Sequence, residues 1–342
     1  MSEALAPGVA ASPPASVDSP RRLMESAARW RWWEYAVWLL AVAAIFALPR
    51  HLLLMNEIAI LALFALSLDL ILGFAGIVSL GHAAFFGLGA YTAGLLSKFG
   101  YGDPLLGLAA AAGMAAILGF TTSFLLLRGS DLTRLMVTLG IALMLLEVAN
   151  REAWLTGGAD GLQGVAVGPV LGLFDFDLYG RTAYVYSLTV LFLLFLLARR
   201  IVHSPFGMAL RAIRLNPLRA RAVGIPVNVR LVAVYTLAAA FAGVAGGLSA
   251  QTTQFVSLDF FNFERSADVM LVLVLGGVGY LYGGVLGAVI FKVMQDFLSS
   301  ITPQYWQFWI GLVLVVIVLA GRDRISAGMR RVLAPFARRR RA

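Results

Sequence analysis

Ten apolar stretches divide this sequence, and most are about as long as the roughly 20 mostly apolar residues that a membrane-spanning helix needs. Hydrophobic residues make up 60% of the 342 residues and charged residues only 13%, which excludes an ordinary soluble globular protein. We therefore predict an all-α polytopic membrane protein with about ten transmembrane helices. They are expected near residues 34–49, 52–72, 75–97, 104–127, 132–150, 182–200, 230–250, 266–282, 284–301 and 304–320.

The basic residues predict the orientation of the chain. Most of the 27 Lys and Arg residues lie before the first span, in the turn from Arg128 to Arg134, in the segment 199–230 or after the last span. An even number of spans brings these four places to one side, and positive charge marks the cytoplasmic side. We expect a disordered basic cytoplasmic tail at 1–33, a transmembrane domain at 34–320, and a basic cytoplasmic tail at 321–342 that faces membrane lipid.

The segment 199–230 carries seven arginines and no acidic residue. Ser204-Pro205 and Asn216-Pro217 each place a helix-capping residue before a proline, so each pair predicts the start of a short helix. The first would run to about Leu215 with Phe206, Leu210 and Ile213 on one stripe. Charge that only retains this loop inside the cell is the alternative. Retention needs neither capped helices nor an apolar stripe, so we expect a docking surface for a cytoplasmic protein.

A glycine-rich stretch, GFAGIVSLGHAAFFGLGAY, occupies residues 73–91. Its glycines permit a broken helix, which would expose backbone polar groups to a solute near the midplane of the membrane. Simple packing of small residues between helices is the alternative. Ser79 and His82 are three apart, so one helical face is expected to present both. The candidate pathway residues are Gly76, Ser79, Gly81, His82, Asp69 and Glu147.

Asp69 and Glu147 lie within predicted spans, where ionisable groups are costly and should face the interior of the bundle or water. They are expected to line a pathway or to satisfy backbone groups at helix ends. Lys292 and Asp296 are four apart and are expected to pair on one helix.

Catalytic chemistry is not indicated. The chain lacks the phosphate-binding pattern G-x-x-x-x-G-K-[ST], so no ATPase site is expected in it. Cysteine is absent and the three histidines are scattered, which predicts no metal site. We expect a transport subunit rather than an enzyme, with no cofactor of its own, and no nucleic-acid partner because the basic residues flank apolar spans.

Residues 73–79 and 243–249 share Gly, Ala, Gly and Ser at corresponding positions. Under the ten-span count, the first copy ends the second span inside and the second copy ends the seventh span outside. This is the pattern that an inverted five-plus-five repeat would produce. Chance is the alternative, because small residues are common in membrane helices.

Four segments resemble the permease subunits of branched-chain amino acid ABC importers, a group that also includes urea and short-chain amide permeases. They are LSLD at 66–69 with the stretch 73–91, LTGGADGL at 155–162, FGMALRAIR at 206–214 with AVGI at 222–225, and FAGVAGG at 241–247. The resemblance implies cytoplasmic ATP-binding subunits that bind the ATP, a second permease, an extracytoplasmic solute-binding protein and a bacterial plasma (inner) membrane location. It places the ATPase-coupling interface at Phe206, Gly207, Leu210, Arg211, Ile213, Arg214 and Gly224.

The resulting prediction is a permease that imports branched-chain or related amino acids. A permease for urea or short-chain amides is one alternative. An ion-coupled secondary transporter that uses Asp69 and Glu147 is another, and a purely structural membrane scaffold is a third, disfavoured by the glycines and polar groups within spans.

Overall fold

The computed structural model describes residues 31–127, 129–177 and 179–320. These residues form helices joined by turns, and within them no strand occurs beyond the isolated bridges Leu162–Val256 and Val170–Phe174. The elements are α2 (Trp32–Ala47), η1 (Pro49–His51), α3 (Leu52–Asp69), η2 (Leu70–Phe74), α4 (Ala83–Lys98), α5 (Pro104–Leu126), α6 (Asp131–Arg151), α7 (Ala153–Thr156), η3 (Gly158–Asp160), α8 (Arg181–Val202), α9 (Pro205–Leu215), α10 (Pro217–Ala222), α11 (Val227–Thr253), η4 (Leu258–Phe261), α12 (Phe263–Gly276), α13 (Leu281–Ile301) and α14 (Trp306–Ala320).

Six helical segments in the described part of the chain are long and apolar enough to cross a membrane. They confirm the prediction of a helical polytopic membrane protein. Each of the other predicted ranges also contains a helix, but α2, α4, α12 and α14 are shorter, at 14 to 16 residues. The six segments are Pro49–Phe74, Pro104–Leu126, Asp131–Arg151, Arg181–Val202, Val227–Thr253 and Leu281–Ile301.

Two predicted spans are wrong in their boundaries because glycines interrupt them. The span predicted at 75–97 is helical only from Ala83, since the chain leaves the helix after Phe74 and Gly76 has a φ of +75°. The span predicted at 266–282 ends at Gly276, because Gly277 and Gly279 also have positive φ values. We call residues 75–82 the first break and residues 277–280 the second break.

Contacts between small residues hold the centre of the bundle together. A Cβ atom at Gly89 of α4 would lie 2.2 Å from the carbonyl oxygen of Gly243 in α11, and one at Gly246 would lie 1.9 Å from that of Phe86. On the other side of α11, Gly243 packs in the same way against Ala111 and Ala115 of α5. Lipid tails are as apolar as the helices, so burial of apolar surface does not drive the helices together in a membrane as it does in water. Close packing of small residues therefore supplies much of the stabilisation of the bundle.

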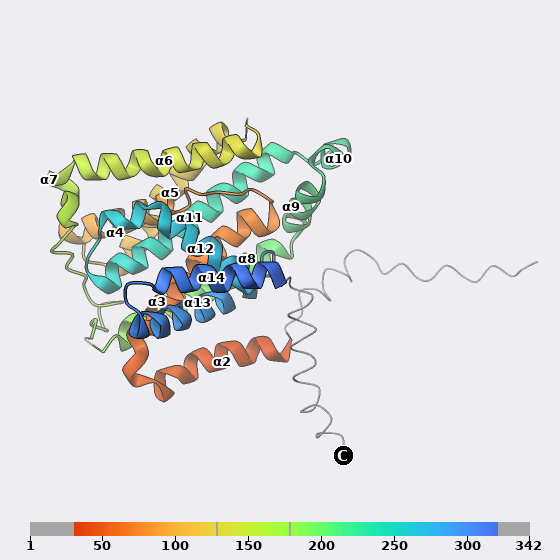
Figure 1. Ribbon diagram of the computed structural model, residues 1–342. Helices are drawn as coiled ribbons and strands as arrows, with labels where there is room; N and C mark the ends of the chain where they lie inside the picture. The colour runs from red at the N-terminus through yellow and green to blue at the C-terminus, as the bar shows by residue number, and fades with distance from the viewer. Residues whose placement is uncertain (1–30, 128, 178, 321–342) are drawn as a thin grey trace, which may run out of the picture.

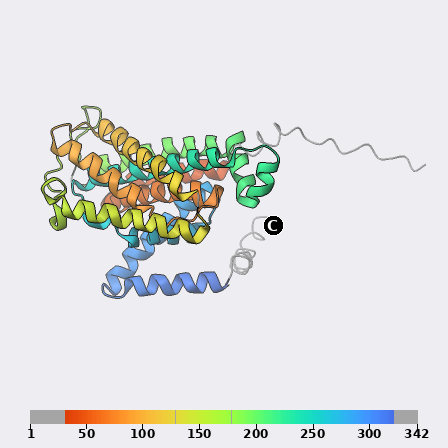
Figure 2. The ribbon, with the colours of Figure 1, turned by 90° about the horizontal axis from the view of Figure 1, so that it is seen from above.

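The outer helices present apolar side chains outward, as a chain in contact with lipid requires. Leu39 and Phe46 of α2, Met144 of α6 and Phe308 of α14 are all more than half exposed. Figures 1 and 2 show α2 and α6 on opposite flanks of the bundle and α14 standing apart from most of it.

The long helices run side by side, so the bundle has two ends (Figure 1). The α9–α10 pair lies at one end and α7 lies at the other. The predicted tails 1–33 and 321–342 fall outside the described residues except for 31–33, and α2 already begins at Trp32. The two copies of the predicted sequence repeat adopt different conformations: residues 73–79 leave a helix, whereas residues 243–249 lie within α11. These two segments are therefore not equivalent structural units.

Candidate functional site

The segment after α8 folds into the two short helices that the sequence predicts. Proline opens α9 and α10, and Gly224 follows α10 with a φ of +88°. The side chain of Asn216 accepts a hydrogen bond of 2.9 Å from the backbone N–H of Arg219, as expected of an N-cap. The Ser204 hydroxyl instead donates to the carbonyl of Ile201, so proline alone marks the start of α9.

The apolar stripe of α9 faces the bundle. Leu210 is 0% exposed and Ile213 is 3% exposed, and a Cβ atom at Gly207 would lie 2.1 Å from the backbone of Val202. Phe206 is partly buried and its ring lies 5.2 Å from the Arg230 guanidinium. Gly207, Leu210 and Ile213 thus pack α9 against the rest of the chain, and Phe206 stays partly open to solvent.

A different set of apolar residues faces outward at this end of the bundle. They come from both short helices and from the turn that follows them. The sequence interpretation overlooked them because it used only the helical spacing of the apolar residues in α9, and that spacing identifies the buried stripe. The exposed fractions are 43% for Met208, 87% for Leu215, 73% for Leu218 and 77% for Val223. We call these four residues the outer face of α9–α10.

The two arginines of α9 reach the end of η2, and Arg214 also reaches the first break that follows it. The guanidinium of Arg211 lies 5.3 Å from the ring centroid of Phe74, within the range of a cation–π interaction. The Nη1 atom of Arg214 donates a hydrogen bond to the carbonyl oxygen of Gly73. A Cβ atom at Gly76 would lie 3.0 Å from the Cγ atom of Arg214. Glycine at position 76 thus allows both the left-handed backbone and the close approach of α9.

Asp69, the last residue of α3, reaches the second break. Its Oδ1 atom accepts a hydrogen bond of 2.7 Å from the backbone N–H of Gly279. The carboxylate is buried, and Arg214 is close enough to interact with its charge. Where a helix is broken, some backbone N–H groups have no carbonyl partner within the helix. A carboxylate that accepts a hydrogen bond from such an N–H group supplies the missing partner. One arginine and one aspartate therefore link α9 to both breaks, and we call this set the Arg214–Asp69 link.

Ser79 and His82 do not share a helical face, because both precede α4 in the first break. Both are fully buried. The Nε2 atom of His82 lies 2.8 Å from the Ser67 hydroxyl, and its ring stacks on Phe64 at 5.4 Å between centroids. The Ser79 hydroxyl has no hydrogen-bonding partner.

Neighbouring helices close over the first break. The N–H of Leu80 donates to the Thr138 hydroxyl, and the N–H of Ala83 donates to the Ser266 hydroxyl at 2.9 Å. A Cβ atom at Gly81 would lie 1.8 Å from the carbonyl oxygen of Thr138. This conformation therefore shows no open path at Ser79, Gly81 or His82.

Glu147 does not join this group. It is exposed on α6, whereas Asp69 is buried in α3. The structure thus brings Asp69, Gly76 and Arg214 together and leaves Glu147 outside. Sequence reasoning missed the contribution of Gly279, although the glycine cluster at 276–284 marks its position.

Two further charged residues have partners other than the expected ones. Lys292 pairs with Glu57 of α3, with 2.7 Å between Nζ and Oε2, rather than with Asp296. Arg199, at the start of the basic segment, is buried and pairs with Glu34 of α2. Arg199 therefore holds helices together and does not belong to the exposed surface.

Comparison with known proteins gives matches over most of the chain. The family described as "Branched-chain amino acid transport system / permease component" matches residues 51–318. The high-affinity branched-chain amino acid transport system permease protein LivM of Salmonella typhimurium is 30% identical over 284 residues, which cover 75% of this chain and 65% of the relative. LivM of Escherichia coli is 29% identical over 314 residues, or 83% of this chain and 72% of the relative.

An archaeal relative is also similar. The "Probable branched-chain amino acid transport permease protein LivH" of Methanocaldococcus jannaschii is 28% identical over 253 residues, which cover 70% of this chain and 77% of that protein. No solved structure matches the chain.

Proposed function

Since the chain belongs to the family of branched-chain amino acid transport system permease components, we propose that it is the membrane-spanning permease subunit of an ATP-driven importer. The proposed substrates are branched-chain or related amino acids, because its relatives are named as branched-chain amino acid transport permeases. ATP is bound by cytoplasmic partner subunits and not by this chain. Urea and short-chain amides remain the alternative substrate class.

The observation that carries this proposal is the α9–α10 unit. Its outer face offers four exposed apolar residues beside several arginines, which suits docking of another protein. Its inner side touches both breaks through the Arg214–Asp69 link. A displacement of α9 by the ATP-binding subunits would therefore act directly on the two interrupted membrane helices.

The proposed topology places α9–α10 in the cytoplasm. Ten spans with both termini inside put the loop 151–181 at the opposite end of the bundle, on the extracytoplasmic side. That loop is the proposed contact for a solute-binding protein. Similarity to both LivM and LivH proteins supports pairing with a second, different permease chain, and the proposed location is a bacterial inner membrane.

Reconstitution tests the proposal. The chain, co-expressed with its ATP-binding subunits and partner permease, should import leucine into proteoliposomes when ATP and a solute-binding protein are supplied. Leu215→Ser combined with Leu218→Ser should lower both retention of the ATP-binding subunits and uptake. The control for retention of the ATP-binding subunits is Leu173→Ser, at a residue 78% exposed in the loop 151–181 at the other end of the bundle.

Uptake by the purified chain alone, driven by a proton or sodium gradient, would overturn the proposal in favour of an ion-coupled carrier. Competition by urea or acetamide but not by leucine would overturn only the substrate class.

A further inference from the structure

A pocket of about 180 Å³ opens between α3, α11, η4, α12 and α13. Its residues come from the start of α3, the end of α11, the start of α12 and the second half of α13, so it lies toward the end of the bundle opposite α9. In the proposed topology this is the extracytoplasmic end. A pocket of this volume holds several water molecules, so a small solute fits into it.

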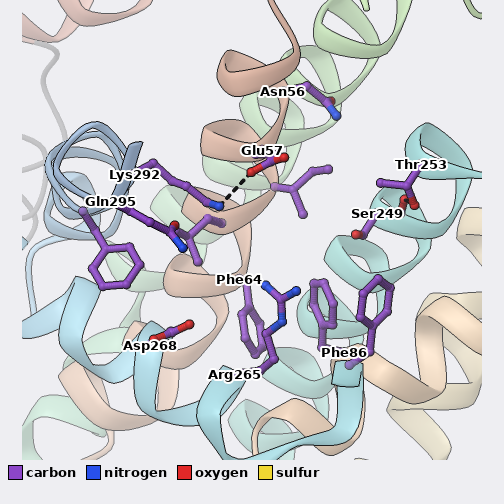
Figure 3. Close-up of a pocket in the computed structure, with 14 residues that line it drawn as sticks. Asn56, Glu57, Phe64, Phe86, Ser249, Thr253, Arg265, Asp268, Lys292 and Gln295 are labelled. Atoms are coloured by element: carbon purple, nitrogen blue, oxygen red, sulfur yellow. Dashed lines mark hydrogen bonds and ion pairs between the residues drawn. The ribbon is translucent and has the colours of Figure 1, made fainter. Parts of the chain in front are cut away.

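The pocket presents one positive and one negative side chain that lack an ion-pair or hydrogen-bond partner among the described residues, although the guanidinium of Arg265 lies 5.6 Å from the centroid of the Phe260 ring. Arg265 and Asp268 lie three residues apart on α12, which brings them to one side of the helix. Neither side chain forms an ion pair or hydrogen bond within the described part of the chain. Figure 3 shows Arg265 pointing into the middle of the pocket and Asp268 beside it. The other charges at the pocket, Glu57 and Lys292, pair with each other.

Two amide side chains at the pocket also have unused hydrogen-bonding capacity. The Oδ1 atom of Asn56 and the Oε1 atom of Gln295 are buried without a partner, and Asn56 is only 4% exposed. Leaving a buried acceptor unpaired is costly, so such acceptors facing a cavity indicate a ligand that donates hydrogen bonds.

Aromatic rings line the apolar part of the pocket. The rings of Phe64 and Phe86 lie 4.8 Å apart, and Phe86 meets Phe260 edge-on at 5.4 Å. Phe291 completes this surface. A small pocket with an aromatic surface and a few converging polar groups is typical of a site for a small organic ligand.

We propose that this pocket binds a zwitterionic α-amino acid with an apolar side chain, in which Arg265 binds the carboxylate and Asp268 binds the ammonium group. The amide oxygens of Asn56 and Gln295 are further hydrogen-bond acceptors at the edge of the pocket, and the phenylalanines contact the side chain. The inference rests on the proposed function, because it assigns a site to the amino acid being imported. The pairing of one cation with one anion explains why the pocket suits a zwitterion better than a neutral amide.

Photo-cross-linking tests the site directly. The purified complex, without the solute-binding protein, is irradiated with a diazirine analogue of leucine, and the adducts are mapped by mass spectrometry. Adducts on residues that line the pocket, which belong to α3, α4, α11, η4, α12 and α13, are expected, and excess leucine but not urea should remove them. Leucine-protected adducts confined to other segments, or no adduct at saturating analogue, would overturn the inference.

Two variants separate this inference from the proposed function. Arg265→Gln and Asp268→Asn should each lower leucine labelling and ATP-driven uptake by about tenfold or more, the weight of one charge-assisted hydrogen bond. Retention of ATP-binding subunits and basal ATP hydrolysis should stay unchanged. Glu264→Gln, an exposed acid on the same helix that does not line the pocket, is the control.

If both pocket variants take up leucine as fast as the wild type, the proposed binding site is wrong, whereas the proposed importer function is unaffected. If the wild-type complex itself transports no amino acid, the proposed site and the proposed substrate class are both wrong.

Discussion

Replacing Arg214 by Gln tests whether α9 acts on the membrane helices. The change removes the hydrogen bond to the Gly73 carbonyl and the positive charge near Asp69. A charge-assisted hydrogen bond contributes about 1.5–3 kcal/mol, and because Arg214 is partly solvent-exposed we expect a loss of about 1–2 kcal/mol. That corresponds to roughly a 5- to 30-fold change in an equilibrium between two conformations.

The assay measures leucine uptake and ATP hydrolysis in the same proteoliposomes. The account predicts that Arg214→Gln lowers the amount of leucine imported per ATP hydrolysed, while the ATP-binding subunits remain bound. Arg219→Gln is the matched control, because it removes the same charge from an exposed position on α10 whose side chain contacts neither break. An unchanged ratio of leucine to ATP in Arg214→Gln would refute the idea that this arginine transmits movement.

The remaining predictions concern stability. Gly89→Ala should destabilise the bundle by about 1–3 kcal/mol, because the added Cβ atom would meet the Gly243 carbonyl oxygen. Gly113→Ala should be tolerated, because its Cβ atom would meet no atom within 4 Å. Thermal unfolding in detergent measures both variants, and equal melting temperatures would contradict the packing argument. Glu34→Gln should cost about 3–5 kcal/mol by leaving Arg199 buried without its carboxylate. The double variant Glu34→Gln/Arg199→Leu should melt closer to the wild type than the single variant, and a further loss in the double variant would speak against this reasoning.

Local patterns predicted the features that depend on neighbouring residues. Asn216 and Pro217 specify the start of α10 because an N-cap and a proline act within one turn. The glycines at 73–81 permit an interrupted helix, since few other residues adopt the backbone found at Gly76, but their pattern alone left packing between helices as the alternative. The apolar stretches predicted the helices, although α4 and α12 are shorter than expected.

Contacts between distant residues could not be read in the same way. Asp69 and Gly279 are 210 positions apart, and Glu57 lies 235 positions from Lys292. The four-residue spacing of Lys292 and Asp296 favoured a local pair, but the packing of α13 against α3 supplied another carboxylate. Leu210 and Ile213 show a further limit: periodicity identifies an apolar face but not whether the same chain or a partner covers it.

The outer face of α9–α10 is proposed to contact the ATP-binding subunits, and a cross-link from an introduced cysteine can detect this contact. The chain has no cysteine, so Leu218→Cys, at a side chain 73% exposed, introduces its one thiol. Labelling of this thiol with a maleimide–benzophenone reagent, followed by irradiation of the complex, should join position 218 to an ATP-binding subunit, whereas Leu173→Cys at the other end should not be joined to one. Failure of Leu218→Cys to cross-link in a complex that hydrolyses ATP, or equal cross-linking from Leu173→Cys, would contradict the account.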